Sequence, residues 1–163
     1  MIRRDKINYY LDIAEAVAGR GTCLRRNYGA IIVKNDQIIS TGYVGAPRGR
    51  ANCIDRGVCT REKLNIPRGE RYELCRSVHA EANAIINAPR QDMMGATLFL
   101  VGVEGDGSGY VANANPCSMC KRMIINAGIS TVIVRDTRDD FHSTKVFDEW
   151  VMQDESLEGT KGY

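Results

Sequence analysis

The sequence predicts an α/β fold, a three-layer α-β-α sandwich with helices on both faces of a central mixed sheet. Helical and strand patterns alternate along most of the chain, which is typical of a sheet covered by helices. The 163 residues, 44% of them hydrophobic and 26% charged, suit one globular domain with a continuous core. We therefore treat residues 1–163 as a single domain.

The first half of the chain predicts a helix followed by a hairpin. Apolar residues recur at helical spacing over residues 8–18, and Gly19 ends the run. Two short runs rich in isoleucine follow over 30–33 and 37–41. Only the polar residues 34–36 separate them, so they predict an antiparallel pair joined by a tight turn.

The second half alternates helices and strands, which are marked off by prolines and glycines. Pro116 is placed to open one helix, and Gly128 is placed to stop it. The predicted elements are a helix over 78–88, a strand over 96–103, a helix over 117–127, a strand over 129–135 and a helix over 144–152. This order predicts neighbouring strands connected by helices that cross the sheet.

An irregular stretch rich in glycine, arginine and cysteine covers about residues 44–77. A structureless segment of this length is uncommon in a compact domain and is often functional, so we expect something to hold it in place. It carries eight basic and four acidic residues between Arg48 and Arg76. That imbalance fits a solvated surface with local ion pairs, and a positive rim for a phosphate is the alternative. From about residue 153 the chain is a polar tail.

Composition and charge limit the partners and the cellular location that we expect for this protein. The formal net charge is +2 and 7% of the residues are aromatic, which gives no general argument for nucleic-acid binding. No apolar run is long enough to cross a bilayer. Asp12 and Glu15 interrupt the region where a secretory signal would need an apolar stretch. We therefore expect a cytoplasmic protein whose partners include neither a membrane nor a nucleic acid.

The strongest chemical signal is a pair of motifs at the starts of two predicted helices. One is a His-x-Glu pair, His79 and Glu81, and the other is Cys117 and Cys120 in a Pro-Cys-x-x-Cys sequence. Two cysteines on a first helical turn point to one side, and a helix N-terminus favours their thiolates. With the histidine they make three ligands for one zinc and leave a fourth position open for water. Zinc lowers the pKa of such a water to about 7.

Glu81 supplies a group that a catalytic zinc site needs and a structural zinc site does not. From the first helical turn, its carboxylate can take a proton from the zinc-bound water, the nucleophile, and pass it to the substrate. Either motif by itself is weak, since a lone Cys-x-x-Cys can be a redox pair or half of a zinc knuckle. Together, in this order, they form the signature of zinc-dependent deaminases. A zinc-binding protein without activity is the less favoured interpretation.

With these motifs the sequence resembles the cytidine/deoxycytidylate deaminase superfamily, and within it the deoxycytidylate (dCMP) deaminase branch. The matching segments lie at 22–25, 29–33, 39–43, 45–49, 79–85, 116–121 and 127–129. The resemblance implies a cytidine deaminase-like fold and the hydrolysis of dCMP to dUMP and ammonia, a reaction of pyrimidine nucleotide biosynthesis. It also implies a homo-oligomer, often a hexamer, and regulation by dCTP and dTTP in some members.

The same resemblance implies three contacts with the substrate. Backbone groups near Ala80 and Asn115 would hold the carbonyl and amino edges of the pyrimidine, and Arg25 would meet a nucleotide phosphate. For Arg25 an ordinary surface arginine is an equal alternative. The chain departs from the family at Val44, where the family usually has an asparagine near the sugar. Another free nucleotide, nucleoside or base is therefore an alternative substrate, and editing of tRNA or another nucleic acid is a second alternative.

Four further cysteines, Cys23, Cys53, Cys59 and Cys75, precede the catalytic motifs. In a chain without an export signal, metal binding explains cysteines better than disulfides do. Four thiolates can form a closed structural zinc site, which would hold the 44–77 stretch in place. The resemblance adds support, because some members of the dCMP deaminase branch have a second zinc on cysteines like Cys23 and Cys53. Buried free thiols are the alternative, because the spacings are irregular.

Overall fold

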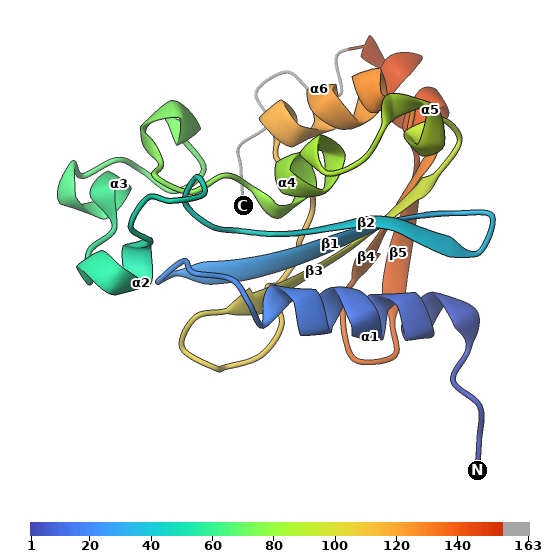
Figure 1. Ribbon diagram of the computed structural model, residues 1–163, viewed down its shortest axis with the longest axis horizontal. Helices are drawn as coiled ribbons and strands as arrows, with labels where there is room; N and C mark the ends of the chain where they lie inside the picture. The colour runs from blue at the N-terminus through green and yellow to red at the C-terminus, as the bar shows by residue number, and fades with distance from the viewer. Residues whose placement is uncertain (155–163) are drawn as a thin grey trace.

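The structure is a computed structural model that describes residues 1–154, and its centre is a five-stranded sheet. The strands are β1 (Arg26–Lys34), β2 (Gln37–Tyr43), β3 (Thr97–Glu104), β4 (Thr131–Arg135) and β5 (Phe141–Lys145). They lie in the order β2-β1-β3-β4-β5 (Figure 1). β3 and β4 are parallel, whereas the other neighbouring pairs are antiparallel. The mixed sheet confirms the predicted fold class.

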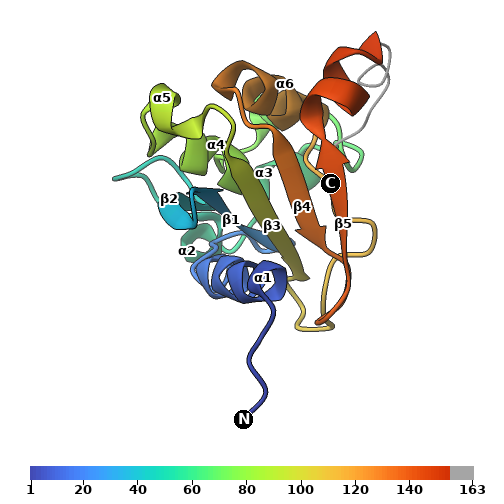
Figure 2. The ribbon, with the colours of Figure 1, turned by 90° about the vertical axis from the view of Figure 1, so that its right-hand side faces the viewer.

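Helices cover both faces of this sheet. α1 (Lys6–Ala18) lies along one face, and α4 (Ala80–Ile86) and α6 (Ser118–Ala127) lie next to each other on the opposite face (Figure 1, Figure 2). The short α5 (Arg90–Met93) and the π-helix η2 (Phe147–Val151) lie on the same side as α6. The three predicted layers are therefore present. Within residues 1–154, no helix has the length and apolar character that a membrane crossing requires.

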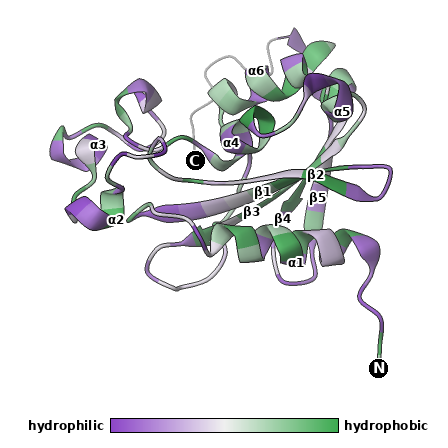
Figure 3. Ribbon diagram, viewed as in Figure 1, coloured by the Kyte–Doolittle hydropathy of each residue, from purple (hydrophilic) through white to green (hydrophobic). Residues whose placement is uncertain are grey.

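The stretch over residues 44–77, called the insertion below, is more ordered than the sequence predicts. It contains the short helices α2 (Cys53–Arg56) and α3 (Thr60–Lys63) and the 3-10 turn η1 (Tyr72–Leu74). α2 and α3 lie beyond the end of the sheet where β2 finishes, and much of the insertion is hydrophilic (Figure 3). Both helices have only four residues, which is too short for hydrophobic periodicity to reveal them.

Arg61 fixes the second half of the insertion from inside. Its side chain is buried, and it donates hydrogen bonds of 3.0 Å to the carbonyl oxygens of Pro67 and Glu70. Its guanidinium carbon lies 4.5 Å from the centre of the Tyr72 ring, which is a cation–π contact. Because backbone carbonyls satisfy the buried cation, a polar segment can keep one conformation without an apolar core of its own.

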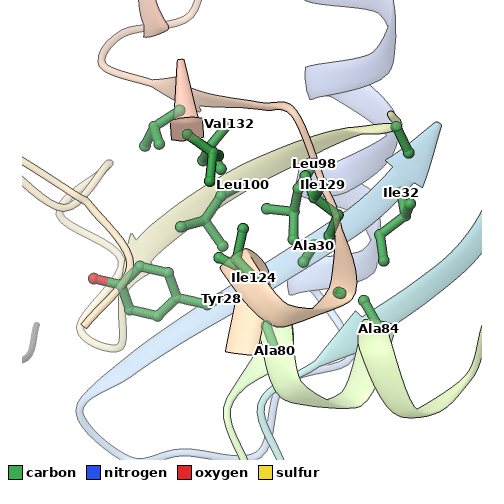
Figure 4. Packing of buried hydrophobic residues seen from close by; sticks show 14 of the residues in the cluster. Tyr28, Ala30, Ile32, Ala80, Ala84, Leu98, Leu100, Ile124, Ile129 and Val132 are labelled. Carbon is green, nitrogen blue, oxygen red and sulfur yellow. The ribbon is translucent and has the colours of Figure 1, made fainter. Parts of the chain in front are cut away.

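The main core lies between the sheet and the pair formed by α4 and α6. Alternate residues of β1 point into it, while Ile31 and Val33 point to the second core beneath α1, as the two-residue period of a strand requires. Truncating residues buried in this way typically costs about 2–5 kcal/mol. The residues labelled in Figure 4 are Tyr28, Ala30, Ile32, Ala80, Ala84, Leu98, Leu100, Ile124, Ile129 and Val132 (Figure 4). This packing fixes where both helices begin.

The hairpin is confirmed, whereas the last predicted helix is partly wrong. β1 and β2 pair antiparallel through Asn35 and Asp36, both at positive φ, as two-residue hairpin turns need. The helix expected over 144–152 is wrong at its start, because Phe141–Lys145 forms β5 on the edge of the sheet. Edge strands carry polar residues such as His142, which weakens the alternating pattern by which strands are recognised.

A buried arginine attaches α1 to the sheet. The Arg135 side chain is fully buried, and its nitrogens lie 2.8 Å from Asp12 Oδ1 and 2.7 Å from Glu15 Oε2. Burial works against a charged Asp12, but hydrogen bonds from Arg4 and Arg135 outweigh it and lower the pKa of this carboxyl group. The pairing explains how β4 can end in a charged residue inside the domain.

Candidate metal centre

Two helix N-termini meet on the side of the sheet opposite α1. His79 is the N-cap of α4, while Cys117 is the N-cap of α6 and Cys120 lies in its first turn. His79 Nδ1 lies 3.5 Å from Cys117 Sγ and 3.5 Å from Cys120 Sγ. All three side chains are buried, and their potential ligand atoms lie within 4.8 Å of one another. The structure thus brings together the three residues that the sequence predicts as metal ligands.

The way each helix begins explains this convergence. Cys117 caps α6 with its own sulfur, which accepts a hydrogen bond of 3.5 Å from the backbone N–H of Cys120. A capping side chain turns back over the first turn, so the two sulfurs share one side of the helix. The fully buried Ala80 and Ala84 let α4 pack closely against the sheet and α6. Gly128 ends α6 in the left-handed conformation, as the sequence predicts.

Without a metal, the electrostatics of the cluster favour the thiolate of Cys117 and keep a proton on Cys120. A hydrogen bond from Cys120, supported by His79, outweighs burial and lowers the pKa of Cys117 to about 4. The same hydrogen bond, with burial and the charge of Glu81, raises the pKa of Cys120. Burial lowers the pKa of His79, but the hydrogen bond to Cys117 and the charge of Glu81 raise it overall. The proton shared by the two sulfurs is the one that a bound cation would displace.

Glu81 lies beside the cluster in the first turn of α4. Its side chain is 0% exposed, and its Oε2 lies 3.7 Å from Cys120 Sγ. Burying a carboxylate costs free energy, and such groups gather at functional sites. The position suits a residue that moves protons next to a metal without being one of its ligands.

The donor set fits zinc. In a tetrahedral site, Zn–S bonds of about 2.3 Å and Zn–N bonds of about 2.0–2.1 Å separate sulfur and nitrogen ligands by roughly 3.5 Å. Both S···N distances in the cluster are 3.5 Å. One imidazole and two thiolates are donors that zinc prefers, and three protein ligands leave one position open.

Comparison with known proteins supports the same conclusion. The family model described as the cytidine and deoxycytidylate deaminase zinc-binding region matches residues 4–136. The chain belongs to this deaminase family. A deoxycytidylate deaminase of Mycobacterium phage D29 is 36% identical over 138 residues, which are 82% of this chain and 96% of the phage protein. A deoxycytidylate deaminase of Saccharomyces cerevisiae is 34% identical over 142 residues, which are 85% of this chain but 40% of the yeast protein.

A solved structure agrees with this placement. The dCMP deaminase of cyanophage S-TIM5, in complex with dCMP and dUMP, has a TM-score of 0.55 and 25% sequence identity to this deaminase. The match covers 83% of this chain and 84% of the cyanophage chain. The chain is thus a hydrolase of the dCMP deaminase branch, and its zinc-binding region contains the His79, Cys117 and Cys120 cluster.

The residues predicted to contact the substrate lie near the metal centre. Ala80 follows His79 as the first residue of α4 and is buried. Asn115 precedes the Pro-Cys motif, and its Oδ1 is buried without a hydrogen-bond partner among residues 1–154. Arg25 forms an ion pair with Glu62 of α3, with Nε and Oε1 3.1 Å apart. Its side chain lines a cleft, called the insertion cleft below, which the insertion shares with the start of β1 and with His79.

The four other cysteines all line the insertion cleft, but their sulfurs do not converge as the catalytic cluster does. Among the described residues, His79, Cys117 and Cys120 are the only group of three or more potential ligands within 4.8 Å of one another. The pKa of Cys75 is raised by burial and, to a smaller extent, by nearby Cys23. The cysteines are therefore neighbours in one cleft.

The contact between Tyr72 and the metal centre could not be predicted from the sequence. The Tyr72 ring meets the His79 imidazole edge to face, with centroids 4.6 Å apart and planes at 78°. Arg61 contacts the same ring. No motif or spacing marks this tyrosine, because the contact arises only when η1 folds the insertion back towards the start of α4.

Two glycines, one packed against α4 and one against α1, allow a test of whether zinc affinity depends on the position of α4. A Cβ at Gly42 would lie 2.3 Å from the Ala84 backbone nitrogen, and a Cβ at Gly29 would lie 2.2 Å from the Ala14 carbonyl oxygen of α1. We expect alanine at either position to lower the free energy of unfolding by roughly 1–3 kcal/mol, because packed backbones must separate. Only Gly42→Ala displaces the helix that begins at His79.

Denaturant unfolding and competitive zinc titration measure the two effects separately. Gly42→Ala should weaken zinc binding as well as stability, whereas Gly29→Ala, the matched control on the opposite face, should lower stability alone. Equal zinc affinity in both variants would show that the metal centre does not depend on the close contact between β2 and α4.

Proposed function

We propose that this deaminase hydrolyses dCMP to dUMP and ammonia. The observation that carries the proposal is the fully buried Glu81 next to the His79, Cys117 and Cys120 cluster. A structural zinc site has no use for a buried carboxylate at this place, whereas a hydrolytic site needs a group that moves protons. The substrate class is supported by the relatives that carry the name deoxycytidylate deaminase and by the cyanophage enzyme with dCMP and dUMP.

In the proposed mechanism, zinc held by His79, Cys117 and Cys120 supplies the Lewis acidity that makes water reactive at neutral pH. Glu81 Oε2 accepts one proton from the attacking water and delivers it to the ring nitrogen, and it then carries the second water proton to the departing amine. One water is consumed and one ammonia leaves for each dUMP formed. Backbone groups near Ala80 and Asn115 hold the pyrimidine edges, so the reacting carbon stays beside Glu81.

Ammonia release by the purified protein tests this proposal. The enzyme should act on dCMP more efficiently than on deoxycytidine, dCTP or adenosine in a folded tRNA. Greater activity on the tRNA would replace the proposal with nucleic-acid editing, and preference for deoxycytidine or dCTP would change the phosphorylation state of the substrate. Stoichiometric zinc without activity on any amino-bearing base would favour a binding protein.

We further propose a second, structural zinc at Cys23, Cys53, Cys59 and Cys75. Support comes from the shared position of all four thiols in the insertion cleft. Four thiolates around one zinc would require the sulfurs to move together, and metal binding supplies free energy for such ordering. The insertion, which relies on hydrogen bonds of Arg61 and has little apolar core, would gain most from such a link.

Cys59→Ser should reduce the zinc content from about two to about one per chain, because a structural site needs all four ligands. The melting temperature should fall by several degrees, since 1 kcal/mol corresponds to about 2–4 °C in a protein of this size. Elemental analysis and calorimetry measure both quantities, with Thr60→Val in the same cleft as the control. One zinc per chain in the unmodified protein would discard the second site.

The quaternary structure and regulation are also proposals. We infer that the chain forms a homo-oligomer such as a hexamer, that it acts in the cytoplasm in pyrimidine nucleotide biosynthesis, and that dCTP and dTTP are its effectors. Two large apolar side chains are exposed on the side of the sheet that α4 and η2 cover: Ile86 is 68% exposed and Phe147 is 62% exposed. They support self-association through that surface. Light scattering measures the oligomeric state, and ammonia release from dCMP with added dCTP or dTTP measures regulation. A monomer whose activity is unchanged by both nucleotides would contradict the two inferences.

A further inference from the structure

The insertion cleft is strongly basic. Of the described residues that line it, five are arginines and none is acidic. A concave surface lined by one sign of charge raises the local concentration of ligands of the opposite sign. The cleft also includes His79, so a ligand held in it lies next to the metal centre.

Three of the five arginines already have partners. Arg61 is buried and donates to backbone carbonyls inside the insertion. Arg25 pairs with Glu62 at 3.1 Å, and Arg26 pairs with Glu104 at 3.2 Å. These three cations therefore serve mainly to hold the walls of the cleft together.

Arg68 and Arg76 are different. Within residues 1–154, no carboxylate lies at ion-pair distance from either guanidinium group. Arg76 is anchored through its Nε, which donates a hydrogen bond of 2.5 Å to the Ala51 carbonyl oxygen. Among the described residues, no hydrogen bond or ion pair uses the two terminal nitrogens of Arg76, so both can donate to a ligand. Arg68 lies on the other arm of the insertion, after α3, and lines the same cleft.

The chemistry of these groups selects a phosphate. A guanidinium group binds phosphate oxygens through two parallel hydrogen bonds, and these charge-assisted bonds are stronger than neutral ones. We propose that Arg68 and Arg76 bind the 5′-phosphate of the nucleotide substrate and so select a nucleotide over a nucleoside. This inference rests on the proposed function, because it takes the cleft that includes His79 as the path of the substrate to the metal centre.

The four thiols of the cleft offer a competing role for the same cations. A zinc bound by four thiolates would carry a net negative charge, which nearby arginines could balance. The two roles differ in what each variant loses. Cations that balance thiolates affect zinc content, whereas cations that bind phosphate affect only ligands that carry a phosphate.

Calorimetric binding of dUMP and of deoxyuridine to the zinc-loaded enzyme tests the proposal without relying on turnover. Arg76→Ala should weaken dUMP binding by roughly 10-fold to 100-fold, the size expected for losing hydrogen bonds between charged groups. Arg68→Ala should weaken it too, Arg76→Lys should restore part of the loss, and deoxyuridine binding should not change. Arg71→Ala is the matched control, because Arg71 pairs with Glu73 at 2.6 Å and lies outside the cleft lining.

Three results would overturn the assignment. Unchanged dUMP binding in the Arg68→Ala, Arg76→Ala double variant would remove the phosphate site. Loss of zinc together with equal weakening of both ligands would assign the arginines to the thiols. A changed response to dCTP with unchanged dUMP binding would assign them to an effector phosphate. Tight dUMP binding without dCMP turnover would count against the proposed reaction but not against the phosphate site.

Discussion

Glu81→Gln should retain zinc and lower kcat for dCMP by roughly 10²–10⁴-fold, the range that general acid–base catalysis contributes. Glutamine has nearly the same shape as glutamate, so the fully buried site at the start of α4 should keep its packing. The amide cannot accept the proton of the attacking water, and so the reaction loses its proton carrier. Ammonia release and zinc per chain, measured on one sample, report the two expectations together.

The control for this variant is Glu73→Gln in the insertion. Glu73 is an exposed carboxylate whose partner, Arg71, lowers its pKa. The charge change is the same, but it lies outside the metal centre, so turnover should stay within about twofold of the unmodified enzyme. Normal turnover by Glu81→Gln would contradict the assigned role of Glu81.

Cys117→Ala should remove zinc and activity together. The sulfur has two functions, since its pKa of about 4 makes it a ready thiolate ligand and its acceptance of the Cys120 N–H caps α6. Outer-shell changes already reduce metal affinity or activity by roughly 10–100-fold, so loss of a ligand should exceed that range. Loss of the cap should also cost about 1 kcal/mol of stability.

Ser118→Ala is the control that distinguishes loss of a zinc ligand from a general disturbance at the start of α6. Ser118 is the first residue of α6 and follows Cys117, but it belongs to neither the ligand cluster nor the cap. This control should keep one equivalent of catalytic zinc and full turnover. If Cys117→Ala dialysed against metal-free buffer retained zinc at the level of the control, Cys117 would not be a ligand.

Much of the fold follows from local patterns in the sequence. β1 and β3 contain continuous apolar runs over residues 30–33 and 98–101, and α1 ends before Gly19, so apolar patterns and the glycine stop identify these elements. Apolar patterns do not reveal β5, because an edge strand needs little apolar surface. The short helices of the insertion could not be predicted either, because four residues are too few to show helical periodicity. Arg61 holds this segment through hydrogen bonds to backbone carbonyls. Such contacts depend on tertiary position, which no local pattern records.

The metal centre could be predicted because its chemistry is concentrated in two short motifs. His79 and Cys117 are separated in the chain, but each stands at a helix start, and the structure shows how those starts meet. The surroundings of the centre could not be predicted in the same way. The contact of Tyr72 with His79 depends on the path of the insertion in space, and so does the position of Arg76 in a cleft whose described lining residues include no carboxylate.

The central claim is that zinc held at His79, Cys117 and Cys120 is required for hydrolysis of dCMP. The most direct measurement is ammonia release from dCMP before chelation, after removal of zinc, and after zinc is returned, with zinc per chain determined at each stage. We predict turnover in the first sample, loss of turnover in the second, and recovery in the third in proportion to the zinc bound at the catalytic site. Undiminished turnover by metal-free protein would contradict the claim.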